Sequence, residues 1–330
     1  MLVPLLLFLL GFALLIKGGD WFVDGSVGIA HRFHLPELLI GATIVSIGTT
    51  LPEVMVSSQA AFQGNAGISY GNAIGSIICN TSLIAAITLA VRPGKVNPKT
   101  ITLPAAFFFG AALCYSAIAW TTGRFERWQG IAFLTVFVIY MLLTVLHMKR
   151  SPESDEGSSE GPDEASAEEQ APDAPLWKDL LRMVVGAAAI AWGADLLVDN
   201  GTLIAQALGV PESVIGLTMV ALGTSLPELI TAITSLIKGH SALSLGNIIG
   251  ANLFNIVLVS GMAITIAPFS IPAEKTVAGI NASLIVDIPL MLFVMAILCV
   301  PALRTGKLKR WQGILLLCIY AAFTVFQFVS

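Results

Sequence analysis

Residues 41–80 read GATIVSIGTTLPEVMVSSQAAFQGNAGISYGNAIGSIICN, and residues 216–255 read GLTMVALGTSLPELITAITSLIKGHSALSLGNIIGANLFN. Aligned without a gap at a constant offset of 175, the two stretches are identical at 15 of 40 positions. Each stretch places a proline and a glutamate, Pro52-Glu53 and Pro227-Glu228, inside an otherwise apolar segment. The chain is therefore an internal duplication, and both copies carry the same unusual polar motif.

The composition is that of a polytopic membrane protein. Of 330 residues, 56% are hydrophobic and only 12% are charged, whereas about a quarter are charged in an ordinary soluble domain. The first apolar stretch exceeds the usual length of a signal-peptide core and lacks a basic flank, so we interpret it as a first span. The four cysteines lie in apolar segments without CxxC spacing, which supports neither a disulfide framework nor a zinc site.

Ten apolar runs are long enough to cross about 30 Å of hydrocarbon. They lie near residues 2–29, 37–62, 68–91, 100–121, 127–148, 178–206, 212–237, 243–267, 276–301 and 308–329. The predicted fold is an all-α membrane protein of ten transmembrane helices in two five-helix repeats, residues 1–150 and 176–330. Arg127-Trp128-Gln129-Gly130 recurs at 310–313 with an offset of 183, so about eight residues are added between the eighth and tenth spans.

Basic residues predict the orientation. Connections after odd-numbered spans hold 13 Lys and Arg residues, and those after even-numbered spans hold 3. Because basic connections stay in the cytoplasm, we expect a multi-pass protein of the cell membrane with both termini outside and the central connection inside. Five spans per half is an odd number, so the second half crosses in the opposite sense. Such inverted repeats are typical of transporters with a site near mid-membrane.

The connection between the halves, residues 151–175, carries nine acidic residues and no Lys or Arg among Ser, Gly, Ala and Pro. Such a segment cannot bury enough apolar area to offset its ordering entropy. We predict a disordered, solvated cytoplasmic linker; a weak cation-sensing role is the alternative.

The two prolines indicate a cation site. A proline inside a helix removes one amide donor and displaces the carbonyl four residues back, here those of Gly48 and Gly223. We expect each helix to be interrupted at its proline. Carbonyls freed in this way are tolerated at membrane depth only where they line a cavity or meet a ligand.

The adjacent glutamates, Glu53 and Glu228, have no Lys or Arg in the four central helices to pair with. An acidic residue at mid-membrane marks a functional site by default; the alternative is a protonated, hydrogen-bonded glutamate. Asn80 and Asn255 each follow 27 residues later and can return to the level of the carboxylates. Asn72 and Asn247 lie in GNxxG patterns that favour close helix packing, so they serve either packing or ligation.

The donors are all hard oxygens: two carboxylates, two amides, several hydroxyls and the freed carbonyls. Six to eight flexible oxygens with two negative charges suit Ca²⁺, whereas Mg²⁺ requires a tighter octahedron. Na⁺ also binds oxygen, and either Na⁺ or protons can neutralise the carboxylates in place of Ca²⁺. The sequence therefore predicts a carrier of ions that is not an enzyme. We expect it to work in the lipid bilayer without cofactor, nucleic acid or obligate protein partner.

The paired motifs GATIVSIGTTLPE and GLTMVALGTSLPE, with GNAIGS and GNIIGA following, resemble the two α-repeats of the cation/calcium exchanger superfamily. The most similar members are its prokaryotic sodium/calcium exchangers. The resemblance implies a secondary antiporter that exchanges Ca²⁺ for Na⁺ by alternating access, with the first span of each half sliding against an eight-helix bundle. It implies Ca²⁺ ligation by the carboxylates of Glu53 and Glu228 and the backbone oxygens of Thr49 and Thr224. It further implies sodium-binding or supporting roles for Ser46, Thr50, Ser76, Asn80, Ala221, Ser225 and Asn255.

Two positions depart from the family pattern. Ala251 is the equivalent of Ser76, where many relatives have serine, so one sodium site loses a hydroxyl. Asn255 replaces the aspartate of potassium-dependent relatives, so we do not expect K⁺ cotransport. A proton/calcium exchanger of the same superfamily is the alternative function. An intramembrane hydrolase using the two glutamates is a further alternative, but the sequence lacks a histidine cluster or serine/lysine pair near them.

Two aspartates four residues apart, Asp20 and Asp24, recur as Asp195 and Asp199. They are either an ion or proton relay or helix-end groups that pair with Lys17 or the basic connections. The four histidines lie at predicted span ends, where loop positions are more common than metal ligands.

Overall fold

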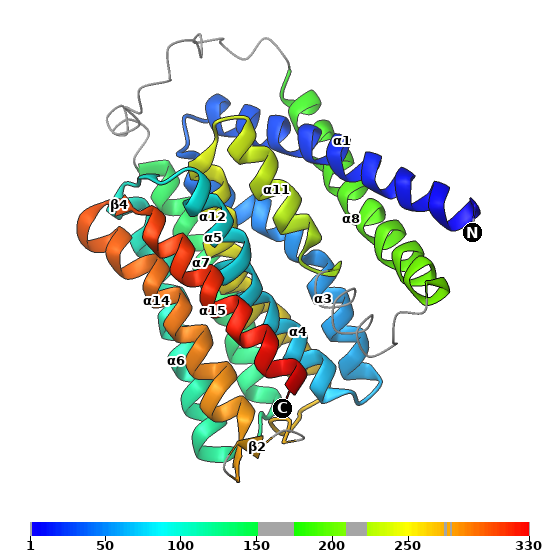
Figure 1. The fold of residues 1–330 in the computed structure, drawn as a ribbon. Helices are drawn as coiled ribbons and strands as arrows, with labels where there is room; N and C mark the ends of the chain where they lie inside the picture. The colour runs from blue at the N-terminus through cyan, green and yellow to red at the C-terminus, as the bar shows by residue number, and fades with distance from the viewer. Residues whose placement is uncertain (1, 151–174, 209–222, 274–275, 278, 330) are drawn as a thin grey trace.

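The computed structural model describes the chain except residues 1, 151–174, 209–222, 274–275, 278 and 330. It is almost entirely helical (Figure 1), and eight of its described helices are long and apolar enough to cross a membrane. These eight are Leu2–Arg32, Glu37–Phe62, Ala66–Val91, Pro98–Thr122, Arg127–Leu146, Leu176–Ile204, Ser241–Ile266 and Ser283–Thr305. Helix α11 (Leu226–Ile237) is shorter, and α15 (Arg310–Val329) ends the chain.

Helices α1 (Leu2–Arg32) and α8 (Leu176–Ala207) lie side by side at one edge of the molecule (Figure 1). They are antiparallel and pack backbone to backbone: a Cβ added at Gly11 would lie 2.8 Å from the Gly193 carbonyl oxygen, and one at Gly18 would lie 2.9 Å from that of Gly186. Their apolar residues, including Leu15, form a hydrophobic cluster with Ile40, Val45 and Leu243 of the neighbouring helices, separate from the main core. The pair thus packs closely along its glycines and contacts the central helices through this cluster.

The main core belongs to the remaining helices. At its centre is the span formed by α12 (Ser241–Phe254), the π-helical segment η4 (Asn255–Val259) and α13 (Ser260–Ile266). Every residue from 243 to 254 is buried. The expected close approach at the second GNxxG pattern is confirmed, because a Cβ at Gly246 would lie 2.1 Å from the Leu38 carbonyl oxygen. Gly250 approaches Ala42 in the same way. At the first GNxxG pattern, the residues equivalent to Leu38 and Ala42 are 213 and 217, which lie outside the described residues.

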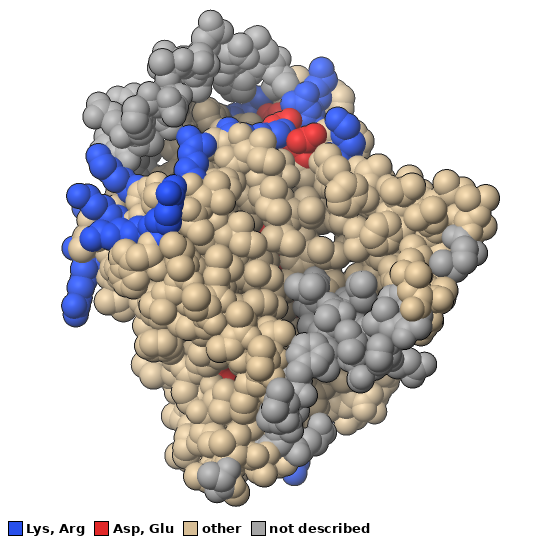
Figure 2. Space-filling view, in the orientation of Figure 1, with Lys and Arg blue, Asp and Glu red and all other residues tan. Residues whose placement is uncertain are grey.

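Short strands join connections of the two halves. Strand β1 (Gly94–Lys95) pairs with β4 (Lys307–Leu308) at one end of α6 (Pro98–Thr122). At the other end of α6, Arg124 forms a β-bridge with Ser270. Lys and Arg side chains gather at the end that carries β4 (Figure 2). The molecule therefore has one strongly basic end, reached by the connections after α5 (Ala86–Val91), α11 and α14 (Ile288–Thr305).

Helices match most predicted spans to within a few residues. Of the seventh span, predicted at 212–237, residues 212–222 lie outside the described part of the chain, and α11 begins at Leu226. The ninth span differs. It was predicted at 276–301, but the helix runs from Ser283 to Thr305. Strands β2 (Thr276–Val277) and β3 (Ile280–Asn281) form a hairpin there instead, turning at Gly279 with φ +79°. This hairpin lies where the change of offset places about eight added residues.

The expected interruption at Pro52 is wrong. Helix α3 (Ser46–Phe62) continues through Pro52, losing only the hydrogen bond that the missing amide would have donated. In the second half, α11 begins at Leu226, so Pro227 occupies the first turn, where no intrahelical donor is needed. The residues before it, Thr224 and Ser225, form a turn. The two motifs therefore differ: one proline lies within a helix and the other starts one.

Candidate cation-binding site

The two glutamates lie in the interior, on facing elements. Glu53 is in α3 and Glu228 is in the first turn of α11, and both side chains are 0% exposed. Neither oxygen of either carboxylate has a hydrogen-bond partner among the described residues. Pro52 and Pro227 line the same small crevice, so the motifs meet at one place.

The surroundings of the two glutamates favour negative charge unequally. Glu228 lies at the N-terminus of α11, where the helix dipole stabilises an anion. Thr49 and Thr50 lie beside its carboxyl group. Glu53 lies mid-helix without that dipole, although Asn72 Nδ2 donates a hydrogen bond to its backbone carbonyl over 3.1 Å. Asn72 also donates to Ser57 Oγ over 2.8 Å, so its role here is the packing of α4 (Ala66–Cys79) on α3.

Asn80 and Asn255 are fully buried, and neither amide oxygen nor amide nitrogen has a hydrogen-bond partner in the described part of the chain. Each is the first residue of a π-helical segment, η2 (Asn80–Ala85) and η4. Short π-helical stretches inside α-helices occur frequently at functional sites. The duplication thus repeats both the amide and the local widening of the helix.

The hydroxyls divide into free and engaged groups. Thr50 and Ser225 are equivalent positions of the two halves, and both are buried with no hydrogen-bond partner among the described residues. Thr49 Oγ1 instead donates to Asn247 Oδ1 over 3.1 Å. Ser46 Oγ lies 2.7 Å from the carbonyl oxygen of Gly41 and 3.0 Å from that of Asn247. Asn247 therefore positions the first motif from the second half.

The remaining predicted site residues differ in burial, and one is not described. Ser76 is buried in α4, and Thr224 is partly exposed in the turn before α11. Ala221 lies outside the described residues. Ala251, the equivalent of Ser76, is fully buried and offers no hydroxyl.

Three features near the site were not predicted. The Cys79 thiol is buried and accepts a hydrogen bond from Tyr320 Oη over 3.7 Å, which its apolar sequence context gave no reason to expect. Asn252 is fully buried, donates to Thr81 Oγ1 over 2.8 Å, and has a free amide oxygen within the described structure. The π-helical segments were also missed. The one signal available is a serine placed to donate five residues back, as Ser46 does to Gly41 and Ser260 does to Asn255.

Three of the equivalent pairs of buried side chains therefore have unpaired polar atoms among the described residues: Glu53 and Glu228, Asn80 and Asn255, and Thr50 and Ser225. Buried polar groups are normally hydrogen-bonded, so a cluster of unpaired ones is unusual and points to a ligand. The described residues hold no group of three or more His, Cys, Asp or Glu side chains suited to a metal. Carboxylates, amides and hydroxyls are hard oxygen donors, which suit Ca²⁺ and related cations.

The fold and this site define a multi-pass membrane carrier for cations. The family described as "Sodium/calcium exchanger protein" matches residues 3–146 and 178–329. The chain belongs to this family of antiporters, which are transporters rather than enzymes.

Similar proteins match over their whole length. The chain is 35% identical to "Putative antiporter CaxA" of Alkalimonas amylolytica, over 100% of both chains. It is 30% identical to "Sodium/calcium exchanger MaX1" of Methanosarcina acetivorans, over 99% of both. Its structure matches that of the sodium-calcium exchanger NCX_Mj soaked with Na⁺ and Sr²⁺, with a TM-score of 0.78 and 32% identity over 98% of each chain.

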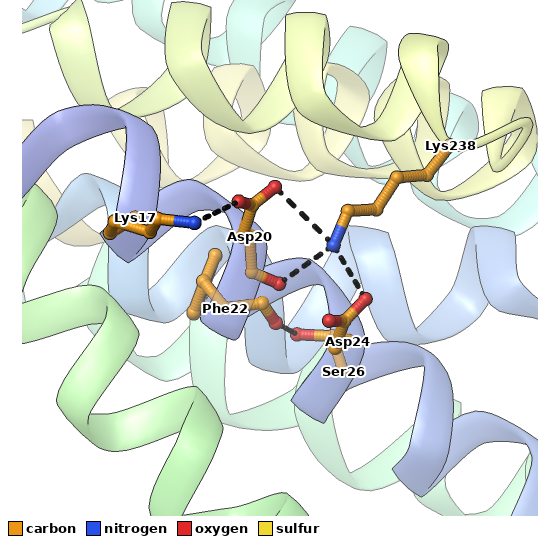
Figure 3. Close-up of polar contacts among 6 residues, drawn as sticks. All are labelled: Lys17, Asp20, Phe22, Asp24, Ser26 and Lys238. Carbon is orange, nitrogen blue, oxygen red and sulfur yellow. Dashed lines mark hydrogen bonds and ion pairs between the residues drawn. The ribbon is translucent and has the colours of Figure 1, made fainter. Parts of the chain in front are cut away.

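The peripheral charged residues form ion pairs at the basic end. Asp20 and Asp24 pair with Lys238, and Asp20 also pairs with Lys17 (Figure 3). The expected ion pairing is confirmed, although both aspartates lie within α1 and not at its end. Asp195 and Asp199 form no ion pair with a described residue. His31 and His240 flank Glu37, with His240 Nδ1 2.8 Å from the carboxylate. These histidines link connections and are not part of the cation site.

Proposed function

We propose that this protein is a secondary antiporter that exchanges Ca²⁺ for Na⁺ at one site between Glu53 and Glu228, open alternately to each side of the membrane. One observation carries the proposal: three equivalent pairs of buried oxygen-bearing side chains have no hydrogen-bond partner among the described residues. Unpaired polar groups of this kind are costly, and a bound cation would satisfy them together. The relatives MaX1 and NCX_Mj, both named as sodium/calcium exchangers, support the choice of ions.

Charge compensation supplies the mechanism. Two bare carboxylates are costly in the membrane interior, and no Lys or Arg lies in α3, α4, α11 or α12 to offset them. One Ca²⁺ makes the pair formally neutral, and Na⁺ ions neutralise it in the same place. The carrier reorients only when the pair is neutralised, so movement of one ion is coupled to return of the other. No cofactor beyond the transported ions is needed.

The ligand set follows the family pattern. Glu53 and Glu228 provide the charged oxygens for Ca²⁺, with the backbone oxygens of Thr49 and Thr224. Thr50, Ser225, Asn80 and Asn255 complete the shell or bind Na⁺, together with Ser76 and the backbone at Ser46 and Ala221. Ser46 contributes through its carbonyl in this proposal, because its hydroxyl bonds with Gly41 and Asn247.

We further propose ten spans in two inverted repeats, with both termini outside the cell membrane. The span Ala66–Val91 ends at the strand pair β1–β4, whereas its equivalent, Ser241–Ile266, ends near the bridge between Ser270 and Arg124. These contacts lie at opposite ends of α6, which supports opposite directions for equivalent spans. The gathering of Lys and Arg at the β4 end supports a cytoplasmic position for that end (Figure 2).

A proton/calcium exchanger is the second candidate, and Ala251 favours it. The residue is fully buried in α12 and removes a hydroxyl that Na⁺ could use. Proteoliposomes that carry the purified protein distinguish the two functions. With internal and external pH clamped, we expect an imposed Na⁺ gradient to drive Ca²⁺ flux. Flux that ignores Na⁺ but follows a pH gradient would refute sodium coupling and establish the second candidate.

A further inference from the structure

Lys238 joins α11 to α1 at the basic end of the molecule (Figure 3). The residue follows the last residue of α11, and its Nζ lies 2.7 Å from Asp24 Oδ1 and 3.4 Å from Asp20 Oδ1 on α1. The same ammonium group donates to the backbone carbonyl of Asp20 over 3.2 Å. One cation therefore holds three oxygens of a single helix turn.

Helix α1 belongs to the glycine-packed pair with α8, whereas α11 leads into the central span. At the same level, a Cβ at Gly19 of α1 would lie 2.7 Å from Thr234 Oγ1 and 2.8 Å from Ile230 Cγ2 of α11. The basic end of α1 is thus held against α11 both by close packing and by charge. Sliding of the α1–α8 pair relative to α11 beyond the reach of the flexible Lys238 side chain breaks these contacts.

The other half has the same turn without the cation. Gln63, the equivalent of Lys238, has φ −81° and ψ −1°, and Lys238 has φ −80° and ψ 0°. Each is followed by a glycine of positive φ, Gly64 at 75° and Gly239 at 89°. In both turns the next amide donates to a carbonyl five residues back over 2.8 Å.

The acidic partners are repeated as well. Asp195 and Asp199 of α8 correspond to Asp20 and Asp24, but the position that would supply their cation is the neutral Gln63. The acids and the turn are therefore present in both halves, and the ammonium group is present in one.

We propose that Lys238 is a one-sided tether that favours the conformation in which α1 is closed on α11 at the basic end. The tether rests on the proposed alternating-access function. In that function, equivalent contacts of the two inverted halves form in opposite access states, so a contact that only one half can make stabilises one of the two states. The fractional exposures of the side chains are 25% for Lys238, 36% for Asp20 and 49% for Asp24. Ion pairs this exposed are modest and screened by salt. We therefore expect a shift of about two- to fivefold in the ratio of the two states.

Hydrogen–deuterium exchange of the full chain in nanodiscs, in dilute choline chloride without Ca²⁺ or Na⁺, measures this shift. Lys238→Gln should accelerate exchange in residues 20–32 and 226–240 by about two- to fivefold, and Lys238→Arg should restore protection. The matched control is Lys17→Gln. Lys17 also pairs with Asp20, but both residues lie in α1, so this variant should leave the hydrogen–deuterium exchange unchanged. Concentrated choline chloride should make the unmodified protein behave like Lys238→Gln.

The reciprocal variant is Gln63→Lys, which places a cation at the position equivalent to Lys238. It should slow hydrogen–deuterium exchange in residues 60–68 and 195–207. In the double variant with Lys238→Gln, these residues should become the more protected ones and residues 20–32 and 226–240 the less protected ones. Unchanged exchange in Lys238→Gln, or an equal effect of Lys17→Gln, overturns the tether. Acceleration that extends to α6 marks general destabilisation and also overturns it.

Ca²⁺ flux in proteoliposomes separates the tether from the function on which it rests. If the expected hydrogen–deuterium exchange pattern is absent while Na⁺ still drives Ca²⁺ flux, the tether alone is refuted. The expected exchange pattern in a chain that moves no Ca²⁺ under a Na⁺ or pH gradient refutes the proposed function. The tether is upheld when the exchange pattern and flux both appear.

Discussion

Unpaired carboxylate oxygens are among the most costly groups that a protein can bury, and the described part of this chain buries four of them, on Glu53 and Glu228. Sequence reasoning selected both residues as candidate ligands, because a glutamate repeated in two apolar segments indicates a functional site. It also selected Asn80, Asn255, Thr50 and Ser225 as candidates. It could not foresee that the Thr49 hydroxyl bonds with Asn247, because that contact joins residues 198 positions apart. Such contacts depend on how the halves pack together.

Neutralising one carboxylate should remove most Ca²⁺ binding. Ca²⁺ affinity depends strongly on the number of charged ligands, so we expect Glu53→Gln or Glu228→Gln to weaken binding on the order of 100-fold and to abolish flux. Equilibrium binding of radiolabelled Ca²⁺ and proteoliposome flux measure the two effects. Glu126→Gln is the matched control, because Glu126 is exposed and pairs with Arg124. Retained transport in Glu53→Gln would refute the ligand assignment.

Restoring a hydroxyl at Ala251 should strengthen sodium binding. The position is fully buried in α12 and corresponds to Ser76. If Na⁺ is the coupling ion, Ala251→Ser should lower the Na⁺ concentration needed for half-maximal Ca²⁺ efflux severalfold, and Ser76→Ala should raise it. Ca²⁺ affinity should change little in either variant. An unchanged Na⁺ requirement in both variants would contradict a sodium role for this pair of positions.

Helices were predicted well where apolar length decides them, and less well where local geometry does. The span Glu37–Phe62 begins and ends where hydropathy placed it. Hydropathy could not reveal that this span winds through Pro52 or widens into a π-helix at η1 (Gly41–Val45). Two hydrogen bonds accompany the π-helix: Ser46 donates to the Gly41 carbonyl within the span, and Tyr140 Oη donates to the carbonyl of Ala42 from another helix. The second contact depends on packing that hydropathy does not record.

Adding a methyl group at Gly18 should destabilise the α1–α8 pair. The new Cβ would lie 2.9 Å from a backbone oxygen of α8, which cannot move aside cheaply. We expect Gly18→Ala to lower stability by about 1–3 kcal/mol, measured as thermal unfolding in detergent. Gly110→Ala is the control, because Gly110 lies in α6 with no described atom within 4 Å of an added Cβ. Removing that helix-interior glycine should stabilise by about 0.5–1 kcal/mol. Equal effects of the two substitutions would contradict the close packing.

At the scale of the whole molecule, the duplication predicted most of the arrangement. The constant offset paired Glu53 with Glu228, and the change of offset to 183 predicted the insertion where the β2–β3 hairpin lies. Symmetry alone could not predict the differences between the halves. Lys238 faces Asp20 and Asp24, whereas Gln63 leaves the equivalent position neutral. Differences of this kind reside in single residues that a repeat alignment treats as mismatches.

Membrane sidedness is testable at two exposed threonines at opposite ends. Thr122 is the last residue of α6, and Thr305 is the last residue of α14 at the basic end. In a variant with the four native cysteines replaced, we expect Thr122→Cys to react with a membrane-impermeant maleimide in intact cells. Thr305→Cys should react only after permeabilisation. The reverse labelling pattern would show that the basic end faces outward.

Crystals soaked with Sr²⁺ or Ca²⁺ locate the cation itself. Anomalous diffraction should reveal one site between α3 and α11, with oxygens of both Glu53 and Glu228 at about 2.3–2.6 Å from a Ca²⁺ ion, and Na⁺ should displace it. The same soak of Glu53→Gln crystals should leave the site empty. A cation bound elsewhere, or two glutamates that remain without any ion between them, would show that these carboxylates do not form a shared transport site.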